Sequence, residues 1–363
     1  MNKMIALDID CTTGLKNYLK ELLNNGKVSS VFSLRRLKNG KVDYGLITQA
    51  ELIDKIEPFY PLMPANAGQL LGRFTPLGKP IAAVVRPCEF RAFVEMVKRE
   101  QVKRENFIII TYSCGGVYPL KINAVQEIDN VLADYQQQVQ SLEIPDGIRP
   151  ACTGCEHINP LEADIFISVA GAEDDSLQAW LRTDIARSLA GFWHTETMDS
   201  DFNESILEPL LAKRKAAKEE LFAGVNTQET GLNGLIDLFG RCIGCHGCNS
   251  VCPICYCTLC DFDSFNYDYN RQILEKELEQ KGAIRLPPDT LFFHLGRLSH
   301  MSFSCVGCGM CSDVCPANIP VAAVFKKIGE ETAGMFDFVS GRSVAEEIPV
   351  MIYKEEEFPE LGE

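Results

Sequence analysis

The sequence has little positive charge: 35 lysines and arginines face 50 aspartates and glutamates over 363 residues, a formal net charge of −15. A nucleic-acid-binding protein carries a basic stripe or domain, so this class is excluded. The chain also lacks an apolar run near the ~20 residues of a membrane span, and its opening lacks the features of a signal peptide. We therefore expect a cytoplasmic protein. A G-x-G-x-x-G pattern is absent as well, which argues against a Rossmann dinucleotide site.

Cysteine is abundant instead, with 16 residues. In a cytosolic chain, metal or redox ligation explains such a content better than a disulfide framework does. Five cysteines are scattered through the first 200 residues, and eleven fall between Cys242 and Cys315. This distribution predicts two units.

The first unit, residues 1–200, alternates strands with helices, which predicts an α/β (α+β) fold. An amphipathic helix is predicted over residues 15–25, with Thr12 or Thr13 as its N-cap and Gly26 just past its end. A hairpin turn is predicted at Asn39-Gly40. The predicted strands are residues 30–36, 42–48, 79–85, 106–111 and 163–169, and a second amphipathic helix covers residues 89–99.

A charged, helical stretch separates the two units and is interpreted as a linker. It contains a basic cluster made of Lys213, Arg214, Lys215 and Lys218. This cluster is either an anchor for an acidic partner or a solvated helix face, and the second interpretation is favoured. The predicted divisions are a linker at 201–234, a second unit at 235–320 with a helical insertion at 261–301, and a tail at 321–363.

Two cysteine runs in the second unit share one spacing, CIGCHGCNSVCP at 242–253 and CVGCGMCSDVCP at 305–316. Both match C-x2-C-x2-C-x3-C-P, the run that binds four-iron four-sulfur (4Fe-4S) clusters in two-cluster ferredoxins. Three thiolates of one run hold one cluster, while the fourth reaches the other cluster. The predicted ligands are Cys242, Cys245, Cys248 and Cys315 for one cluster, and Cys305, Cys308, Cys311 and Cys252 for the other.

Small residues between these ligands let backbone amides approach the sulfurs. They are Gly244, Gly247, Gly307 and Gly309. Structural zinc is the alternative, because CxxC pairs also bind zinc. Two complete runs are far more specific than a lone CxxC pair and favour the clusters.

Three more cysteines, Cys255, Cys257 and Cys260, have no place in the two-cluster scheme. We expect them to pack beside the clusters as small buried residues, with ligation of another metal as the alternative. His294 and His300 lie in the insertion without a third ligand at suitable spacing. They are expected to be structural or cluster-adjacent.

Four cysteines of the first unit form a further candidate group. Cys88 and Cys114 each follow a predicted strand, while Cys152 and Cys155 form the pair CTGC before another. Four thiolates at one end of a sheet are enough for a third 4Fe-4S cluster. Inert, buried thiols at Cys88 and Cys114 are the alternative, and the pattern alone leaves both open.

Several segments resemble the beta-subunit family of coenzyme F420-dependent hydrogenases and formate dehydrogenases. These segments are the opening helix TTGLKNYLKELLNNGKV at 12–28, the strand-Pro-Cys-helix element RPCEFRAF at 86–93, the CxxC segment CTGCEHINPLEADI at 152–165 and the Arg-Thr strand end LRTD at 181–184. Residues 293–322 and FDFVSGRS at 336–343 are similar to ferredoxin-bearing formate dehydrogenase beta chains. The resemblance covers most of the chain.

The resemblance implies a flavin and cluster domain over residues 1–200 in which FAD exchanges a hydride with a deazaflavin. A flavin suits this role because clusters carry one electron, whereas a deazaflavin or nicotinamide carries two. The resemblance also implies that Cys88, Cys114, Cys152 and Cys155 hold the third cluster, and that Thr13, Gly14, Arg86 and Arg182 bind cofactor.

We interpret the chain as an oxidoreductase subunit that carries three 4Fe-4S clusters and FAD and is not catalytic alone on formate or hydrogen. The expected partner is the large subunit of a formate dehydrogenase or hydrogenase, or a heterodisulfide-reductase-type complex. A flavin-free electron relay and a zinc-stabilised interaction protein are the alternatives.

Residues 321–363 are expected to contribute a docking tail. The stretch 318–339 has apolar residues at helical spacing, a stripe that more often packs on its own domain. Residues 340–363 mix apolar and acidic residues without a regular pattern, so we expect them to be disordered or to order against another chain.

Overall fold

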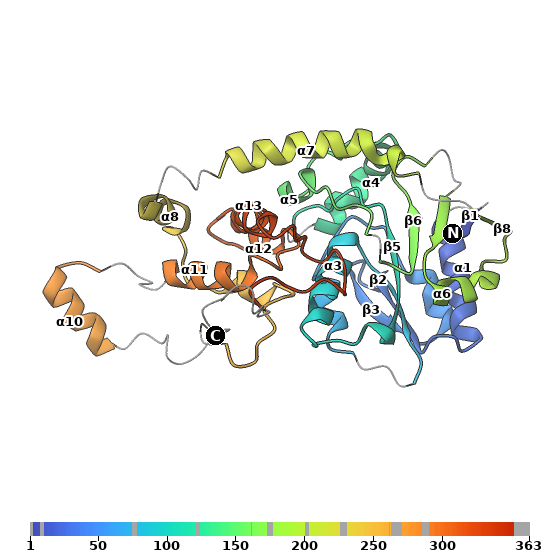
Figure 1. Cartoon of the computed structure of the whole chain (residues 1–363), viewed down its shortest axis with the longest axis horizontal. Helices are drawn as coiled ribbons and strands as arrows, with labels where there is room; N and C mark the ends of the chain where they lie inside the picture. The colour runs from blue at the N-terminus through green and yellow to red at the C-terminus, as the bar shows by residue number, and fades with distance from the viewer. Residues whose placement is uncertain are drawn as a thin grey trace, which may run out of the picture.

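The computed structural model describes residues 3–7, 11–74, 78–120, 124–160, 162–172, 177–199, 203–225, 231–260, 262, 271–284 and 290–351. One mixed sheet with the strand order β3-β2-β4-β5-β6-β7-β1-β8 forms the centre of the α/β unit (Figure 1). Its strands are β1 (Lys3–Leu7), β2 (Ser30–Arg36), β3 (Val42–Ile47), β4 (Ile81–Val84), β5 (Phe107–Tyr112), β6 (Ile165–Ser168), β7 (Leu177–Leu181) and β8 (Thr197–Asp199).

The middle of this sheet is parallel, because β2, β4, β5 and β6 pair in the same direction. Alternate side chains of a strand point to opposite faces, and parallel strands are normally covered on both. In β5, Ile108 and Ile110 pack with the residues of α1, whereas Phe107 and Ile109 pack with those of α3. This double burial explains the continuous apolar runs from which the strands were predicted.

The helices cover both faces of the sheet and build the second unit. They are α1 (Cys11–Asn24), α2 (Ala67–Leu71), α3 (Pro87–Lys98), α4 (Ala124–Gln140), α5 (Pro150–Thr153), α6 (Asp184–Ser188), α7 (Glu208–Ala223), α8 (Gly231–Phe239), α9 (Gly247–Ser250), α10 (Arg271–Lys281), α11 (Thr290–Met301), α12 (Met310–Asp313) and α13 (Val321–Gly334). Within the described parts of the chain, every helix is too short or too polar to span a bilayer.

Helix α1 begins earlier than expected. It starts at Cys11, so Thr12 and Thr13 lie in its first turn and neither is the N-cap. Its end is as predicted, since Gly26 has a left-handed φ of +60°. The next amide, of Lys27, donates to the Leu22 carbonyl at 2.8 Å, which closes the helix end.

The predicted hairpin is confirmed: β2 and β3 pair antiparallel, and Gly40 adopts a φ of +80° in the turn. The strands β1 and β8 and the helix α4 were not predicted as elements, and of β7 only its end was expected, from the resemblance at residues 181–184. Strands β7 and β1 pair antiparallel next to β6 and extend the sheet beyond its parallel centre.

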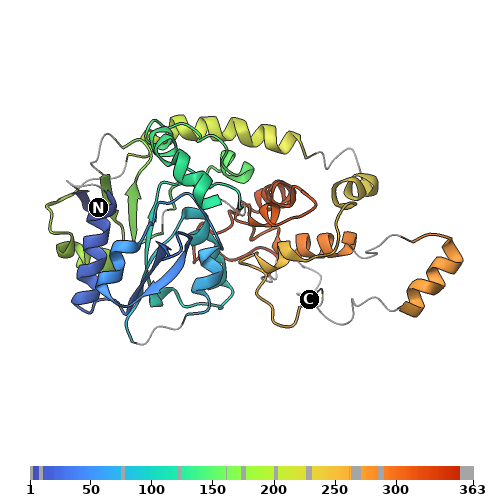
Figure 2. The same ribbon diagram turned by 180° about the vertical axis from the view of Figure 1, so that it is seen from behind.

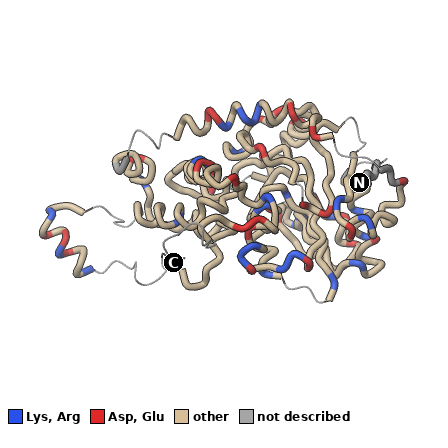
Figure 3. Tube along the Cα trace, viewed as in Figure 1, with Lys and Arg blue, Asp and Glu red and all other residues tan. Residues whose placement is uncertain are grey.

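Helix α7 buries one residue of the basic cluster and leaves Lys213 and Lys215 exposed. It runs along the α/β unit and over the second unit (Figures 1 and 2). Arg214, on this helix, is only 1 % exposed, so the interpretation of the basic cluster as a solvated face is wrong at this position. Acidic and basic residues are mixed along α7 and along α10, and neither helix forms a block of one charge (Figure 3).

The two units share one apolar cluster. Phe90 and Phe93 of α3 belong to the same cluster of buried side chains as Val324 and Phe325 of α13 and Met301 of α11. This continuity packs the second unit against one face of the sheet.

The C-terminal stretch also packs on this chain as far as it is described. Helix α13 buries Val321 and Val324, and Ile348 is buried farther on. The Ser340 carbonyl accepts a hydrogen bond from Arg91 Nε at 3.0 Å, and the Gly341 amide donates to Glu95 at 2.7 Å. Residues 321–351 are therefore not a free tail, while residues 352–363 of the expected docking segment lie outside the described residues.

Candidate iron-sulfur sites

The two cysteine runs fold into loops of the same shape. Gly244 (φ +66°) and Gly307 (φ +69°) occupy equivalent positions, two residues after the first cysteine of each run. Two residues farther on, His246 and Gly309 are also left-handed, and the short helices α9 and α12 begin next. Glycine adopts this backbone without strain, which explains its use in both loops.

Backbone amides point at the sulfurs of these loops. The Gly244 amide donates to Cys242 Sγ at 3.4 Å, and the Ile319 amide donates to Cys315 Sγ at 3.4 Å. Such bonds stabilise thiolate ligands and tune the potential of a bound cluster. Gly247, which was expected to have the same role, is the first residue of α9.

The structure brings the predicted ligands together in the crossed arrangement. The fourth cysteine of the first run, Cys252, lines a cavity of about 40 Å³ together with three cysteines of the second run. Apolar side chains such as Met301 and Phe325 complete its wall. We call this set the second group; its thiols are Cys252, Cys305, Cys308 and Cys311.

The remaining four thiols of the two runs form the first group. Burial raises the pKa of the Cys248 thiol to about 11, and the nearby cation of Arg297 opposes this rise. Charges on the three other thiols of the group add to it, so all four lie near one another. The first group is Cys242, Cys245, Cys248 and Cys315, of which Cys245 is exposed.

A third group forms at the carboxyl edge of the sheet. Cys88 is in the first turn of α3, directly after β4, and Cys114 follows β5. Burial raises the pKa of Cys114 to about 11, and the charge on Cys152 contributes. Burial also raises the pKa of Cys88, with contributions from Cys308, Cys114 and Cys155. Cys88 and Cys152 of this group and Cys308 of the second group pack against one small cluster of buried side chains.

The donor sets fit clusters better than single ions. A structural zinc ion holds four thiolates at about 2.3 Å from one centre. Four thiols spread around an apolar cavity, with amides aimed at sulfur, instead match the corners of a cubane.

Buried arginines brace the loops that carry these thiols. Arg149 donates to the Cys308 carbonyl at 2.6 Å and pairs with Asp313 at 2.6 Å. Arg214 of α7 donates to the carbonyls of Cys155 at 3.1 Å and Cys114 at 3.0 Å. The sequence gives no signal for the role of Arg214, since an arginine in a charged helix is normally solvated.

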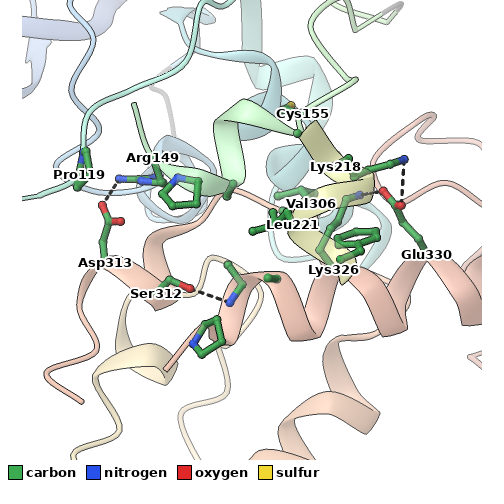
Figure 4. A pocket seen from close by; sticks show the side chains of 18 of the residues that line it. Pro119, Arg149, Cys155, Lys218, Leu221, Val306, Ser312, Asp313, Lys326 and Glu330 are labelled. Carbon is green, nitrogen blue, oxygen red and sulfur yellow. Dashed lines mark hydrogen bonds and ion pairs between the residues drawn. The ribbon is translucent and has the colours of Figure 1, made fainter. Parts of the chain in front are cut away.

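A groove of about 430 Å³ lies where the third group meets the second run. Cys155 and Val306 line it, with α7 and α13 on its sides (Figure 4). Glu330 pairs there with Lys218 at 3.3 Å and with Lys326 at 3.0 Å. The pair with Lys218 joins α7 to α13 across the boundary of the two units, whereas the pair with Lys326 lies within α13.

Two of the residues implied in cofactor binding are at opposite edges of the sheet. Arg86 follows β4, whereas Arg182 follows β7, whose end pairs with the start of β6. Arg86 donates to the carbonyls of Tyr60 at 2.5 Å and Leu62 at 2.7 Å. Arg86 and Arg182 therefore lie at opposite edges of the sheet, and their part in cofactor binding stays a prediction.

The side chain of Arg182 is fixed by contacts with neighbouring residues of this chain. Its guanidinium donates to the Pro160 carbonyl at 2.5 Å and to Asn159 Oδ1 at 2.7 Å, and lies over the Phe166 ring. Thr13 and Gly14 are in the first turn of α1. Strand β1 pairs antiparallel with β7, and β7 pairs antiparallel with β6, so β1 runs in the direction of the parallel strands. The first turn of α1 therefore follows the end of β1 that lies at their carboxyl edge.

A cavity of about 370 Å³ opens at that edge and was not predicted. Thr12 of α1, Tyr112 and Ser113 after β5 and Val169 after β6 line it, as do residues of α4 such as Tyr135. Ligands in open α/β sheets commonly bind outside the carboxyl ends of the strands. Gly115 also lines the cavity, so the cavity adjoins Cys114 of the third group.

The extra cysteines and histidines have different surroundings. Cys255 Sγ is 3.7 Å from Met301 Sδ, close to the second group, whereas Cys257 is exposed, which contradicts its expected burial. Cys255, Cys257, Cys260 and His300 line one pocket of about 390 Å³. His294 is buried and stacks on Phe239 with ring centroids 4.1 Å apart, as expected for a structural residue.

An α/β unit with a thiol group at its sheet edge, fused to paired ferredoxin-type loops, defines the class of iron-sulfur electron-transfer proteins. Residues 239–319 match the family described as 4Fe-4S dicluster domain. The C-terminal unit is therefore a ferredoxin-like dicluster domain.

Relatives of known function cover nearly the whole chain. The chain is 26% identical over 370 residues to the F420-dependent formate dehydrogenase subunit beta of Methanocaldococcus jannaschii, covering 92% of each chain. It is 28% identical over 361 residues to the F420-dependent formate dehydrogenase 1 subunit beta of Methanococcus maripaludis, covering 89% of each. The resemblance stated from the sequence is thereby confirmed, as is the oxidoreductase class of its relatives.

One solved structure with a similar title is more distant. A chain of the F420-reducing [NiFe] hydrogenase complex from Methanosarcina barkeri is 13% identical, with a TM-score of 0.43. The match covers 61% of this chain and 92% of that chain. This structural likeness is too low to support an argument about the fold.

Proposed function

We propose that the chain is the iron-sulfur beta subunit of a cytoplasmic, multi-subunit oxidoreductase and carries electrons between a hydride carrier and a catalytic subunit. One observation carries the proposal: three groups of four thiols follow one another, from the carboxyl edge of the sheet to the exposed Cys245. The relatives support coenzyme F420 as the carrier and a formate dehydrogenase subunit as the partner.

The order of the groups proposes a route. The third group adjoins the second through Cys88 and Cys308, and the second adjoins the first because the two cysteine runs exchange their fourth thiol. Electrons entering at the sheet edge would leave from the first group, at Cys245. The chain's own contribution is to fix these thiols, exclude water around them and balance their charge with buried arginines.

The cavity beside Cys114 is the proposed flavin site. It is large, lies at the carboxyl ends of β5 and β6, and adjoins the third group. A flavin bound there would convert a two-electron hydride into single electrons. Tyr112, Ser113 and Tyr135 would line its surroundings, together with the first turn of α1.

The test uses full-length protein purified without oxygen. Flavin content is measured, and the protein is then assayed for oxidation of reduced F420 or a nicotinamide with a dye as acceptor. We expect about one flavin per chain and dye reduction by one hydride donor. An iron-loaded protein without flavin that oxidises no hydride donor would favour the flavin-free relay. A colourless protein with zinc would contradict the proposed function altogether.

A further inference from the structure

A buried arginine from the insertion reaches the sulfur of a predicted ligand. Arg297, on α11, is 3 % exposed. Its Nη1 donates to Cys248 Sγ at 3.1 Å, and its Nη2 donates to the Cys248 carbonyl at 3.2 Å. Both atoms of the fork therefore engage one residue of the first group.

The same guanidinium also borders the second group. Arg297 lines the cavity formed by Cys252 and the thiols of the second run. The rings of Phe325 and Phe293 flank its carbon, at 5.0 Å and 5.6 Å. Arg297 thus lies between the two groups, in apolar surroundings that screen its charge poorly.

No carboxylate neutralises this cation among the residues that the structure describes. Its Nε is buried and has no hydrogen-bond partner there. Arg149, which braces the second run, differs in its charge balance: it pairs with Asp313 at 2.6 Å, and it donates to the Cys308 carbonyl rather than to a ligand sulfur. A buried, unpaired charge is costly, so the thiolates are the groups that compensate Arg297.

The guanidinium of Arg297 stays a cation at any working pH, because an arginine side chain does not lose its proton in proteins. Reduction of a cluster adds one negative charge, and a fixed cation donating to a ligand sulfur stabilises the reduced form most where it is nearest.

We propose that Arg297 is a positioning residue that raises the reduction potential of the first cluster and so draws electrons to the exposed end of the route. The role of the insertion is then to deliver α11, and with it this cation, between the two cysteine runs. This inference rests on the proposed clusters, but it concerns a residue that neither cysteine run contains.

The experiment is a potentiometric titration of the full-length protein, followed by electron paramagnetic resonance without oxygen. In Arg297→Gln, we expect the midpoint potential of one component to fall. At a fixed potential its reduced-to-oxidised ratio should drop at least tenfold, which corresponds to about 59 mV for one electron. The other components should move less. A Cys245→Ser variant identifies the component of the first group, because its own potential should change.

Two further variants separate charge and position. Arg297→Lys keeps the charge but cannot donate both bonds, so an intermediate shift is expected. Arg241→Gln is the matched control: Arg241 adjoins Cys242 in sequence but is exposed, so its potentials should equal those of the unaltered chain. If Arg297→Gln loses iron, Arg297→Lys decides the question.

The inference is overturned if Arg297→Gln keeps its iron and its potentials do not shift. If only Arg297→Lys keeps iron, unshifted potentials in that variant overturn the inference instead. A shift equal to that of Arg241→Gln would do the same. Absence of iron from the unaltered protein is a different outcome, because it contradicts the proposed function itself.

Discussion

Replacing Arg214 tests whether α7 is part of the third site. The Arg214→Met change keeps much of the side-chain volume but removes the donors to the Cys114 and Cys155 carbonyls, at 3.0 Å and 3.1 Å. Leaving a buried acceptor unsatisfied costs about 1–3 kcal/mol, so two carbonyls correspond to about 2–6 kcal/mol. This loss of stabilising free energy affects the segments that carry two thiols of the third group.

The assay follows cluster absorbance in urea at a fixed incubation time, since cluster loss is irreversible and midpoints are then comparable only at equal times. We expect the midpoint of Arg214→Met to fall by roughly 1 M or more. Lys215→Met is the matched control, because Lys215 is the next residue on α7 and is exposed. Equal midpoints for the two variants would refute the bracing role of Arg214.

Three other changes probe the thiol groups and the packing around them. Cys252→Ala should remove the cluster of the second group and spare that of the first, as judged by resonance spectra; the reverse loss contradicts the crossed arrangement. Gly116→Ala should lower the iron content by about four atoms per chain, which is one cluster. Gly116 has a φ of +111°, and an added Cβ would lie 3.0 Å from the Cβ of Cys152. Gly191→Ala, with open space around it, should lose none. Burial lowers the pKa of His294 to about 4, below the 6.5 of an unperturbed histidine. The unfolded chain then binds a proton that the folded chain does not, so stability falls as the pH drops from about 6.5 towards 4. His294→Phe should weaken this fall in unfolding measurements across that window, and an unchanged pH dependence would count against the burial argument.

The thiol groups of the two runs were predictable because their ligands are local in sequence. A C-x2-C-x2-C loop fixes three thiols by itself, and the match of the second run to the first supplies the fourth. Gly244 and Gly307 mark the left-handed positions of both loops. The third group was harder to predict from the sequence, because Cys88 and Cys114 come together only when β4 and β5 pair in parallel.

Features that depend on long-range packing could not be predicted. Arg214 lies among charged residues on α7 and Arg297 among apolar residues and histidines on α11, and only the docking of those helices directs the two side chains at cluster loops. Arg86 and Arg182 were grouped by resemblance, although the reversal of β7 separates them across the sheet. The cavity beside Cys114 depends on α4, which has no cysteine or glycine pattern to mark it.

The most direct test of the central claim counts iron and acid-labile sulfide per chain in protein purified without oxygen. The claim of three clusters predicts about twelve of each in the unaltered protein and about eight in a folded Cys88→Ala variant. Cys88 is the chosen position because it belongs to the third group and adjoins the second. An unaltered protein with about eight irons, or an unchanged count in the variant, would contradict a continuous route through three clusters.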